Sequence, residues 1–186
     1  LGVDTPVLPA SDDVIRTRIR TIDGSWLSFQ EYFVGRGHRD EVIDVEYAGA
    51  QHADPAPGVI EAIEAASLVV IAPSNPPLSI RPILEVRAIA QAVAAHRRVV
   101  AISPLFGGRA LKGPADRVMA SLGYPDGNAG VAAAYNGMIT DLVIDVGDAP
   151  DAEQLSTDVT VHITDTHLVS DEASRRFGRW FELTFR

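Results

Sequence analysis

The feature that most constrains the fold is a short apolar run, followed by a polar turn and then by an apolar stretch at helical spacing. It spans residues 67–84, SLVVIAPSNPPLSIRPIL. Residues 68–72 are continuously apolar, which is typical of a strand buried on both faces. The polar segment 74–77 follows, and a helix is expected to start near Ser79. Because ligands of open α/β sheets bind beyond the carboxyl ends of strands, the sequence predicts a binding loop here, with a plain helix cap as the alternative.

The same order of strand, loop and helix recurs from residue 57 to the end of the chain. Strands are expected at 68–72, 99–102, 142–146 and 159–163, and helices at 58–66, 79–96, 113–123, 128–138 and from Ser170 onward. This alternation predicts βαβ units with right-handed crossovers. The expected fold is therefore an α/β, Rossmann-like three-layer sandwich with a mostly parallel sheet.

The first 50 or so residues follow a different, β-rich pattern. Arg16, Arg18 and Arg20 alternate with Ile and Thr, which predicts a strand with the arginines on one face, either contacting an anion or solvated. Asp23-Gly24 indicates a two-residue hairpin turn, and residues 26–34 and 42–47 are expected to be further strands. We predict one domain over residues 1–186, in which a β-rich insertion (1–55) near the N-terminus is added to a parallel α/β core (56–186).

Charge and composition argue against several classes of function. The formal net charge of −9 argues against general affinity for nucleic acid or acidic membranes. The absence of cysteine excludes disulfides and thiolate metal sites and fits a reducing compartment. No apolar run approaches the roughly 20 residues of a membrane span, and no signal segment opens the sequence. The sequence thus predicts a soluble, cytoplasmic protein with no nucleic-acid or membrane partner.

Two loops that leave neighbouring strands carry the residues suited to chemistry. The first holds Ser74, Asn75 and Ser79, and the second holds Ser103, Gly107, Gly108, Arg109 and Lys112. Glycine lets backbone N–H groups approach a ligand, and the two cations could neutralise a phosphate. These loops predict a phosphorylated or nucleotide ligand, with a plain mobile surface loop as the alternative, since no Walker-type pattern is present.

Asp165 follows the last expected strand and should lie at the same sheet edge. It could order the ligand, accept a proton, or only stabilise its own turn. The five histidines show no pair at helical spacing, so no His-based metal site is predicted, and no catalytic residue is assigned. The lack of a Gly-x-Ser-x-Gly elbow argues against a serine hydrolase.

Two long segments resemble the CofD/FbiA family, the 2-phospho-L-lactate transferases of deazaflavin coenzyme F-420 biosynthesis. They are IAPSNPPLSIRPIL at 71–84 and AISPLFGGRALKGPADRVMASLG at 101–123, and shorter matches are LPASDD at 8–13, FQEYFV at 29–34, APGVIEAI at 56–63 and ITDT at 163–166. The resemblance implies transfer of a phospholactyl or phosphoenolpyruvyl group, an EC 2.7.8 type reaction. The donor would be guanosine diphosphate-linked, the acceptor would be the hydroxyl of the deazaflavin FO, and GMP would leave.

The resemblance also implies Mg²⁺ as a cofactor and a homodimer, although no stretch of the sequence demands a dimer. It implies that Ser74, Asn75 and Ser79 face the deazaflavin or the reacting phosphate, and that Gly107, Gly108 and Lys112 line the same pocket. Arg81 departs from the Gly that is usual in the family. Family members are much longer, and the loops that hold their metal have no counterpart here. The chain is therefore expected to be a C-terminal portion, without metal ligands of its own, or a compact relative.

Two other interpretations stay open. The chain could be a nucleotide-sugar-binding regulatory protein that resembles the gluconeogenesis-factor group of the same superfamily, which shares the segment 68–84 but catalyses no transfer. It could also be an inactive fragment. The segments FQEYFV and GGRALKGPAD favour the transferase. The choice between a lactate-derived and an enolpyruvate-derived donor is not settled by the sequence.

Overall fold

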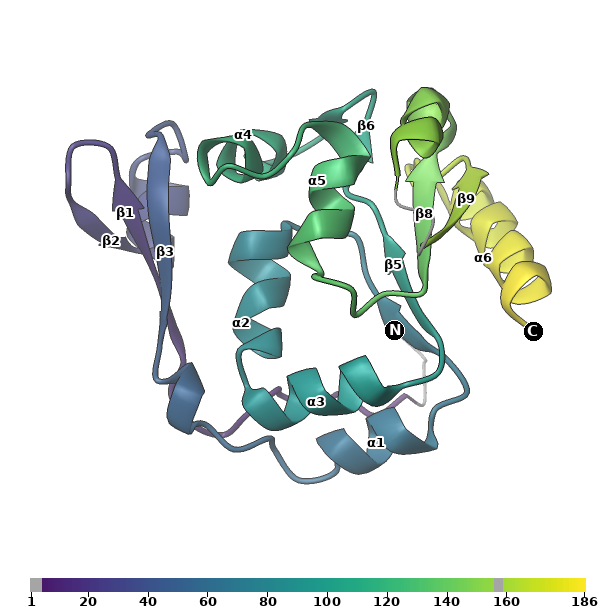
Figure 1. The fold of residues 1–186 in the computed structure, drawn as a ribbon, viewed down its shortest axis with the longest axis horizontal. Helices are drawn as coiled ribbons and strands as arrows, with labels where there is room; N and C mark the ends of the chain where they lie inside the picture. Colours follow the sequence, from purple (N-terminus) through teal and green to yellow (C-terminus); the bar gives the residue numbers. More distant parts are fainter. Residues whose placement is uncertain (1–4, 156–158) are drawn as a thin grey trace.

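A four-stranded parallel sheet lies between α6 (Asp171–Phe185) on one side and the other helices on the other (Figure 1). The computed structural model describes residues 5–155 and 159–186. The sheet has the order β4-β5-β8-β9, made of β4 (Val69–Ile71), β5 (Val99–Ile102), β8 (Asp141–Asp145) and β9 (Thr160–Thr164). A small antiparallel hairpin, β6 (Leu105–Phe106) and β7 (Arg109–Ala110), follows β5. The predicted α/β fold with a parallel sheet is confirmed.

Helices cover both faces of this sheet, because side chains alternate along each strand. On one face, Val99 and Ala101 of β5 pack in a core to which α2 (Arg81–Leu84), α3 (Arg87–Ala95) and α5 (Gly127–Ala134) contribute. On the other face, Val100 and Ile102 pack with Phe185 of α6. The helix α1 (Val59–Ala65) also packs against the first core and lies next to α3 in Figure 1. The three-layer arrangement follows from this alternation.

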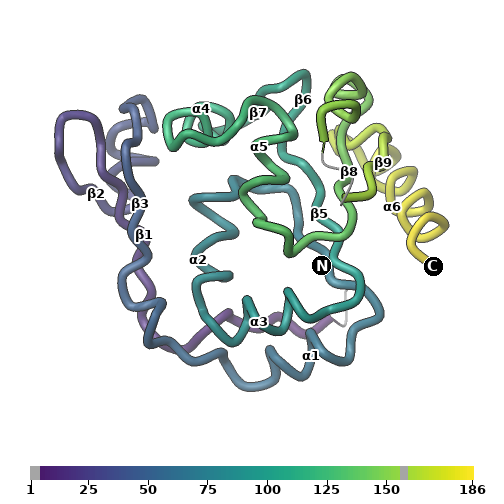
Figure 2. Tube along the Cα trace, viewed as in Figure 1, coloured from purple at the N-terminus to yellow at the C-terminus, as the bar shows by residue number. Residues whose placement is uncertain are grey.

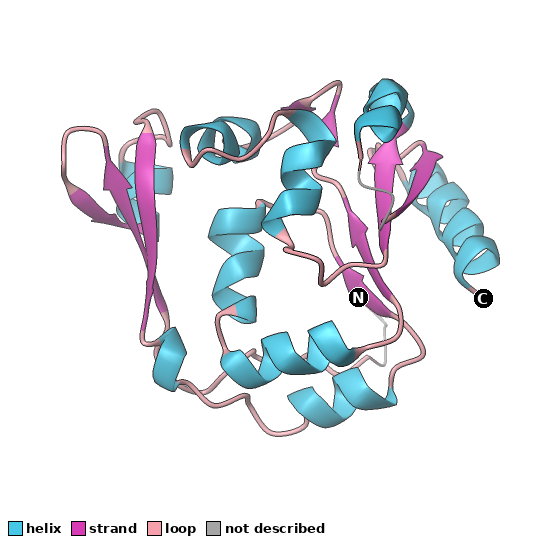
Figure 3. Cartoon of the chain, viewed as in Figure 1, coloured by secondary structure: helices cyan, strands magenta, loops and turns pink. Residues whose placement is uncertain are grey.

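A second, antiparallel sheet stands apart from the first. It has the order β2-β1-β3, from β1 (Arg16–Thr21), β2 (Trp26–Ser28) and β3 (Val42–Ala48). The hairpin predicted at Asp23-Gly24 is present, but its loop has three residues (22–24) and not two, because the Thr21 N–H donates to the carbonyl oxygen of Ser25 over 3.0 Å. Gly24 ends this loop at φ +84°. Figures 2 and 3 show this sheet on the outer side of α2 and α4 (Ala115–Ser121), which separate it from the parallel sheet. We call it the hairpin sheet.

The expected return strand at 26–34 is wrong beyond Ser28. The chain turns instead into the helical segment η1 (Glu31–Gly35). Ser28 and Glu31 cap each other, since the Ser28 N–H donates to Glu31 Oε2 over 2.7 Å and the Glu31 N–H donates to Ser28 Oγ over 3.3 Å. This reciprocal capping box starts a helix and ends the strand.

Three other expectations are corrected. The single helix at 79–96 is divided into η3 (Pro76–Ile80), α2 and α3, because Val86 is extended and fully buried in the core. The helix expected at 128–138 ends at Ala134, since Asn136 and Gly137 have positive φ. The strand β4 is not buried on both faces: among the described residues it pairs only with β5, and Val70 is 45% exposed. No helix in residues 5–155 or 159–186 combines the length and apolarity needed to span a membrane.

Candidate functional site

A cavity of about 450 Å³ lies beyond the carboxyl ends of β4, β5 and β9. Its walls come from the loops after these strands and from η1 and the residues that precede it. The lining residues are Phe29, Phe33, Pro73, Ser74, Asn75, Ser79, Pro104, Phe106, Ala110, Leu111, Lys112, Gly113, Pro114, Ala115, Thr166, His167, Leu168 and Val169. We call this hollow the site cavity. It has the position at which open α/β sheets bind their ligands.

The first predicted loop supplies three lining residues, Ser74, Asn75 and Ser79. Asn75 caps η3, because its Oδ1 accepts a hydrogen bond from the Leu78 N–H over 3.0 Å. Its other side-chain atom, Nδ2, is buried and has no hydrogen-bond partner among the described residues. A buried donor without a partner is unfavourable, so this amide is suited to donate to a ligand in the site cavity.

The second predicted loop is divided between two hollows. Lys112 lines the site cavity and brings a positive charge to it. Gly108 and Arg109 instead line a separate hollow of about 510 Å³, which also has carboxylates such as Asp116 in its wall. Gly107 does not line the site cavity. The expectation that the two glycines share a pocket with Lys112 is therefore corrected.

The two glycines are explained by a tight turn. Gly107 and Gly108 join β6 to β7 and have φ values of +59° and +75°, as a two-residue hairpin turn requires. The Gly108 N–H donates to Asp148 Oδ1 over 2.5 Å, so this N–H already has an anionic partner. Burial raises the pKa of Asp148, although the hydrogen bond from Gly108 opposes that shift.

Ser103 and Asp165 have local structural contacts. Ser103 is buried, and its Oγ accepts a hydrogen bond from the Leu105 N–H over 3.1 Å. Asp165 accepts the His167 N–H over 3.0 Å and pairs with Arg176 over 2.7 Å. These contacts, the His167 N–H foremost, lower the pKa of Asp165 and make it a weak proton acceptor. Of the three roles considered for Asp165, these contacts match the stabilisation of its own turn.

The loop after β9 still reaches the site cavity through Thr166 and His167. Asp145, at the end of β8, fixes the position of this loop. Its Oδ2 accepts the Thr166 N–H over 3.0 Å, while its Oδ1 accepts the Gly147 N–H over 2.9 Å at the start of η4 (Val146–Gln154). Asp145 was not singled out from the sequence, because a polar residue that ends a strand has no distinctive pattern.

Aromatic rings form a part of the site cavity that the sequence did not predict. Phe29 and Phe33 stack with ring centroids 5.2 Å apart, and Phe106 and His167 lie 5.2 Å apart. All four line the site cavity. The sequence did contain a signal for the first pair: Phe29 and Phe33 are four residues apart and follow the capping-box residue Ser28, so a helix would place both rings on one face. Flat apolar rings with an amide donor and a lysine suit a planar, polar-edged ligand.

The described residues do not fit a metal site on their own. Across residues 5–155 and 159–186, no group of three or more His, Cys, Asp or Glu side chains converges as metal ligands would. Mg²⁺ therefore stays an expectation from family resemblance, and no chemical step is derived through it.

Comparison with known proteins identifies the family. The model of the family described as 2-phospho-L-lactate transferase CofD matches residues 1–175. The chain is 36% identical over 175 residues to the 2-phospho-L-lactate transferase of Methanothermobacter thermautotrophicus, covering 92% of this chain and 56% of that protein. It is 35% identical over 179 residues to that of Methanococcoides burtonii, covering 96% and 58%. The chain thus spans little more than half the length of these curated relatives.

Among solved structures, the fold is similar to that of protein BH3568 from Bacillus halodurans. The TM-score is 0.64 at 20% identity, covering 96% of this chain and 62% of that one. A likeness at this identity supports the fold alone. Because the family model matches residues 1–175 and relatives about 35% identical cover more than nine tenths of the sequence, the chain belongs to the 2-phospho-L-lactate transferase CofD family.

Proposed function

We propose that the protein transfers a phospholactyl or phosphoenolpyruvyl group from a guanosine diphosphate-linked donor to the hydroxyl of the deazaflavin FO, releasing GMP, in coenzyme F-420 biosynthesis. In this reaction the FO hydroxyl oxygen bonds to the phosphorus that carries the acid. The bond from that phosphorus to the bridging oxygen breaks, GMP leaves with the bridging oxygen, and the hydroxyl proton passes to solvent. The family supports the reaction class, and the site cavity supports the ligand class.

The observation that carries the proposal is the unpartnered Asn75 amide in the wall of an aromatic cavity. Phe33 of η1, Phe29 just before it, and Phe106 and His167 from other segments offer flat surfaces for a tricyclic ring. Asn75 Nδ2 would donate to an oxygen of the ring or of the reacting phosphate. Lys112 would offset negative charge on the phosphate during transfer.

Ligand-induced thermal stabilisation tests the proposal in the protein. A ligand at about 100 times its dissociation constant adds about 2.7 kcal/mol to the free energy of unfolding. For a protein of this size that is a rise in Tm of roughly 5–10 °C. We expect such shifts with FO and with GDP. Shifts with UDP-sugars alone would support the nucleotide-sugar-binding alternative, and no shift with any of these ligands would support the inactive fragment.

A further inference from the structure

A second hollow adjoins the site cavity and reaches the hairpin sheet. It has a volume of about 740 Å³ and is lined by residues of β1, β2, η3 and α2, among them Arg16, Arg18 and Trp26. Phe29 and Ser79 line both hollows. The two are therefore neighbouring parts of one extended surface, with Phe29 and Ser79 as their common wall. We call the second hollow the arginine groove.

Of the three arginines of β1, only Arg16 has no acidic residue opposite it on β3. On β3, Arg18 is opposite Glu46 and Arg20 is opposite Asp44, whereas Arg16 is opposite Ala48. Arg18 forms an ion pair with Glu46 over 3.0 Å. Within the described parts of the chain, Arg16 forms no ion pair, and its side chain is exposed. Arg16 is thus an uncompensated guanidinium in the wall of the groove.

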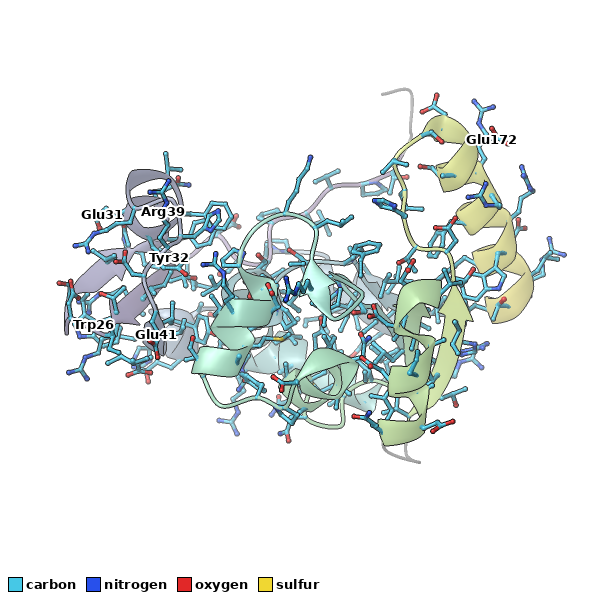
Figure 4. All side chains as sticks on the ribbon, turned by 90° about the horizontal axis from the view of Figure 1, so that it is seen from above. Trp26, Glu31, Tyr32, Arg39, Glu41 and Glu172 are labelled. Carbon is cyan, nitrogen blue, oxygen red and sulfur yellow. The ribbon has the colours of Figure 1, made fainter. Side chains whose placement is uncertain are left out.

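The neighbours of Arg16 are held in place by other contacts. The guanidinium of Arg18 lies 5.0 Å from the ring centroid of Trp26. Glu31, an acidic residue that lines the groove, accepts the Ser28 N–H over 2.7 Å in the capping box. Figure 4 shows Trp26 and Glu31 at the hairpin end of the molecule, far from Glu172 of α6. In a chain of formal charge −9, an exposed arginine without an ion pair among the described residues, in the wall of a groove, is suited to contact an anionic ligand.

We propose that Arg16 binds the anionic group of a ligand that extends from the site cavity into the arginine groove. The ring of the ligand would lie among the aromatic residues, and a phosphate or carboxylate would cross Phe29 and Ser79 to reach the guanidinium of Arg16. This inference rests on the proposed function. The same anionic chemistry occurs in the diphosphate of the donor and in the phospholactyl group of the product, so the test contains a ligand for each.

The test compares Arg16→Gln with Arg20→Gln in the protein expressed from its complete reading frame. Arg20 is a matched control, because it lies on the same strand and the same face, carries the same charge, and does not line the groove. Dissociation constants are measured for three ligands: FO, phospholactyl-FO and GDP. FO has no anionic group that would reach Arg16, whereas the other two have one. Arg16→Lys is included because a lysine keeps the charge but loses the paired donors.

We expect Arg16→Gln to weaken one of the two anionic ligands by about tenfold, as loss of a hydrogen bond to a charged group does. FO should stay within about twofold, as should all three ligands in Arg20→Gln. Arg16→Lys should fall between wild type and Arg16→Gln. Loss for phospholactyl-FO assigns the groove to the product, and loss for GDP assigns it to the donor.

Two results would overturn the inference, and they separate it from the proposed function. In the first, the wild type binds FO and the anionic ligands, but Arg16→Gln alters the dissociation constants of phospholactyl-FO and GDP no more than Arg20→Gln does. Arg16 is then a solvated residue, and the anion site is refuted while the proposed function stands. If the wild type binds no FO, the proposed function and the anion site are both refuted.

Discussion

Replacing Asn75 separates its structural role from its proposed role in binding. Its Oδ1 caps η3 through the Leu78 N–H, while its Nδ2 is buried without a partner in the site cavity wall. Asn75→Ala removes both groups, whereas Asn75→Ser keeps a cap acceptor and removes only the amide. Loss of a cap to alanine costs about 1 kcal/mol, and serine caps nearly as well as asparagine. For a protein of this size the alanine variant should lose about 2–4 °C in Tm, and the serine variant much less.

The effect on ligands should follow a different pattern. Both variants lose the donor. A hydrogen bond to a neutral ring oxygen of FO is worth about 0.5–1.5 kcal/mol, or about two- to tenfold in affinity, and one to the charged phosphate about 1.5–3 kcal/mol, or about tenfold or more in rate. We therefore expect Asn75→Ser to be nearly as stable as wild type but as defective as Asn75→Ala in FO binding and transfer. Thermal unfolding, FO titration and the rate of product formation are measured for all three proteins. Near-normal binding and transfer by Asn75→Ser would show that Asn75 is only a helix cap.

Three further predictions concern stability. Gly130→Ala should lower the free energy of unfolding by about 1–3 kcal/mol, because the added Cβ would collide with a carbonyl oxygen of the preceding loop. Gly178→Ala should raise the free energy of unfolding by about 0.5–1 kcal/mol, because its Cβ would lie in open space on a helix. Thermal unfolding of both variants tests this pair, and a loss of stability in both would contradict it. Tyr47→Phe should cost about 1–3 kcal/mol in chemical denaturation, since it removes the 2.6 Å hydrogen bond to the carbonyl of buried Pro77; an unchanged midpoint would contradict this. Hydrogen bonds from Thr21 and Ser25 lower the pKa of Asp23 from 3.8 to about 2, so the ionised Asp23 stabilises the fold above pH 4 and this stabilisation is lost as the pH falls towards 2. The stability difference between wild type and Asp23→Asn should therefore shrink over that range. A constant difference would contradict this prediction.

The parallel core was predictable because its signals are local. The strands β5, β8 and β9 lie within one residue of their expected bounds, since β5 and β8 centre on short apolar runs and β9 alternates apolar with polar residues. Ser170 caps α6 as predicted, with the Ala173 N–H donating to its Oγ over 3.2 Å. The division of the helix expected at 79–96 was not predictable, because it depends on Val86 entering a core formed by distant segments.

The site cavity was predictable only where sheet topology determines it. Parallel strands end at the same edge, so Asn75 and Lys112 come together as their strand positions require. The pair Gly107-Gly108 was ambiguous, since the same dipeptide serves a phosphate loop and a two-residue hairpin turn, and the structure has the turn.

The aromatic part of the site cavity, with Phe29 and Phe33, depends on how the hairpin sheet packs against the rest of the molecule. The residue pattern along a single strand does not predict how one sheet packs against another part of the fold. The hairpin sheet packs on η3 and α4 through buried Ile19 and Leu78, and Tyr47 bonds to the carbonyl of Pro77 next to the Asn75 cap. The capping box at Ser28 then turns the chain so that Phe29 enters the site cavity. A change that loosens the hairpin sheet should therefore weaken binding of the planar ring without touching the polar loop. Tyr47→Phe should lower FO affinity more than it lowers GDP affinity, which an equal loss for both ligands would refute.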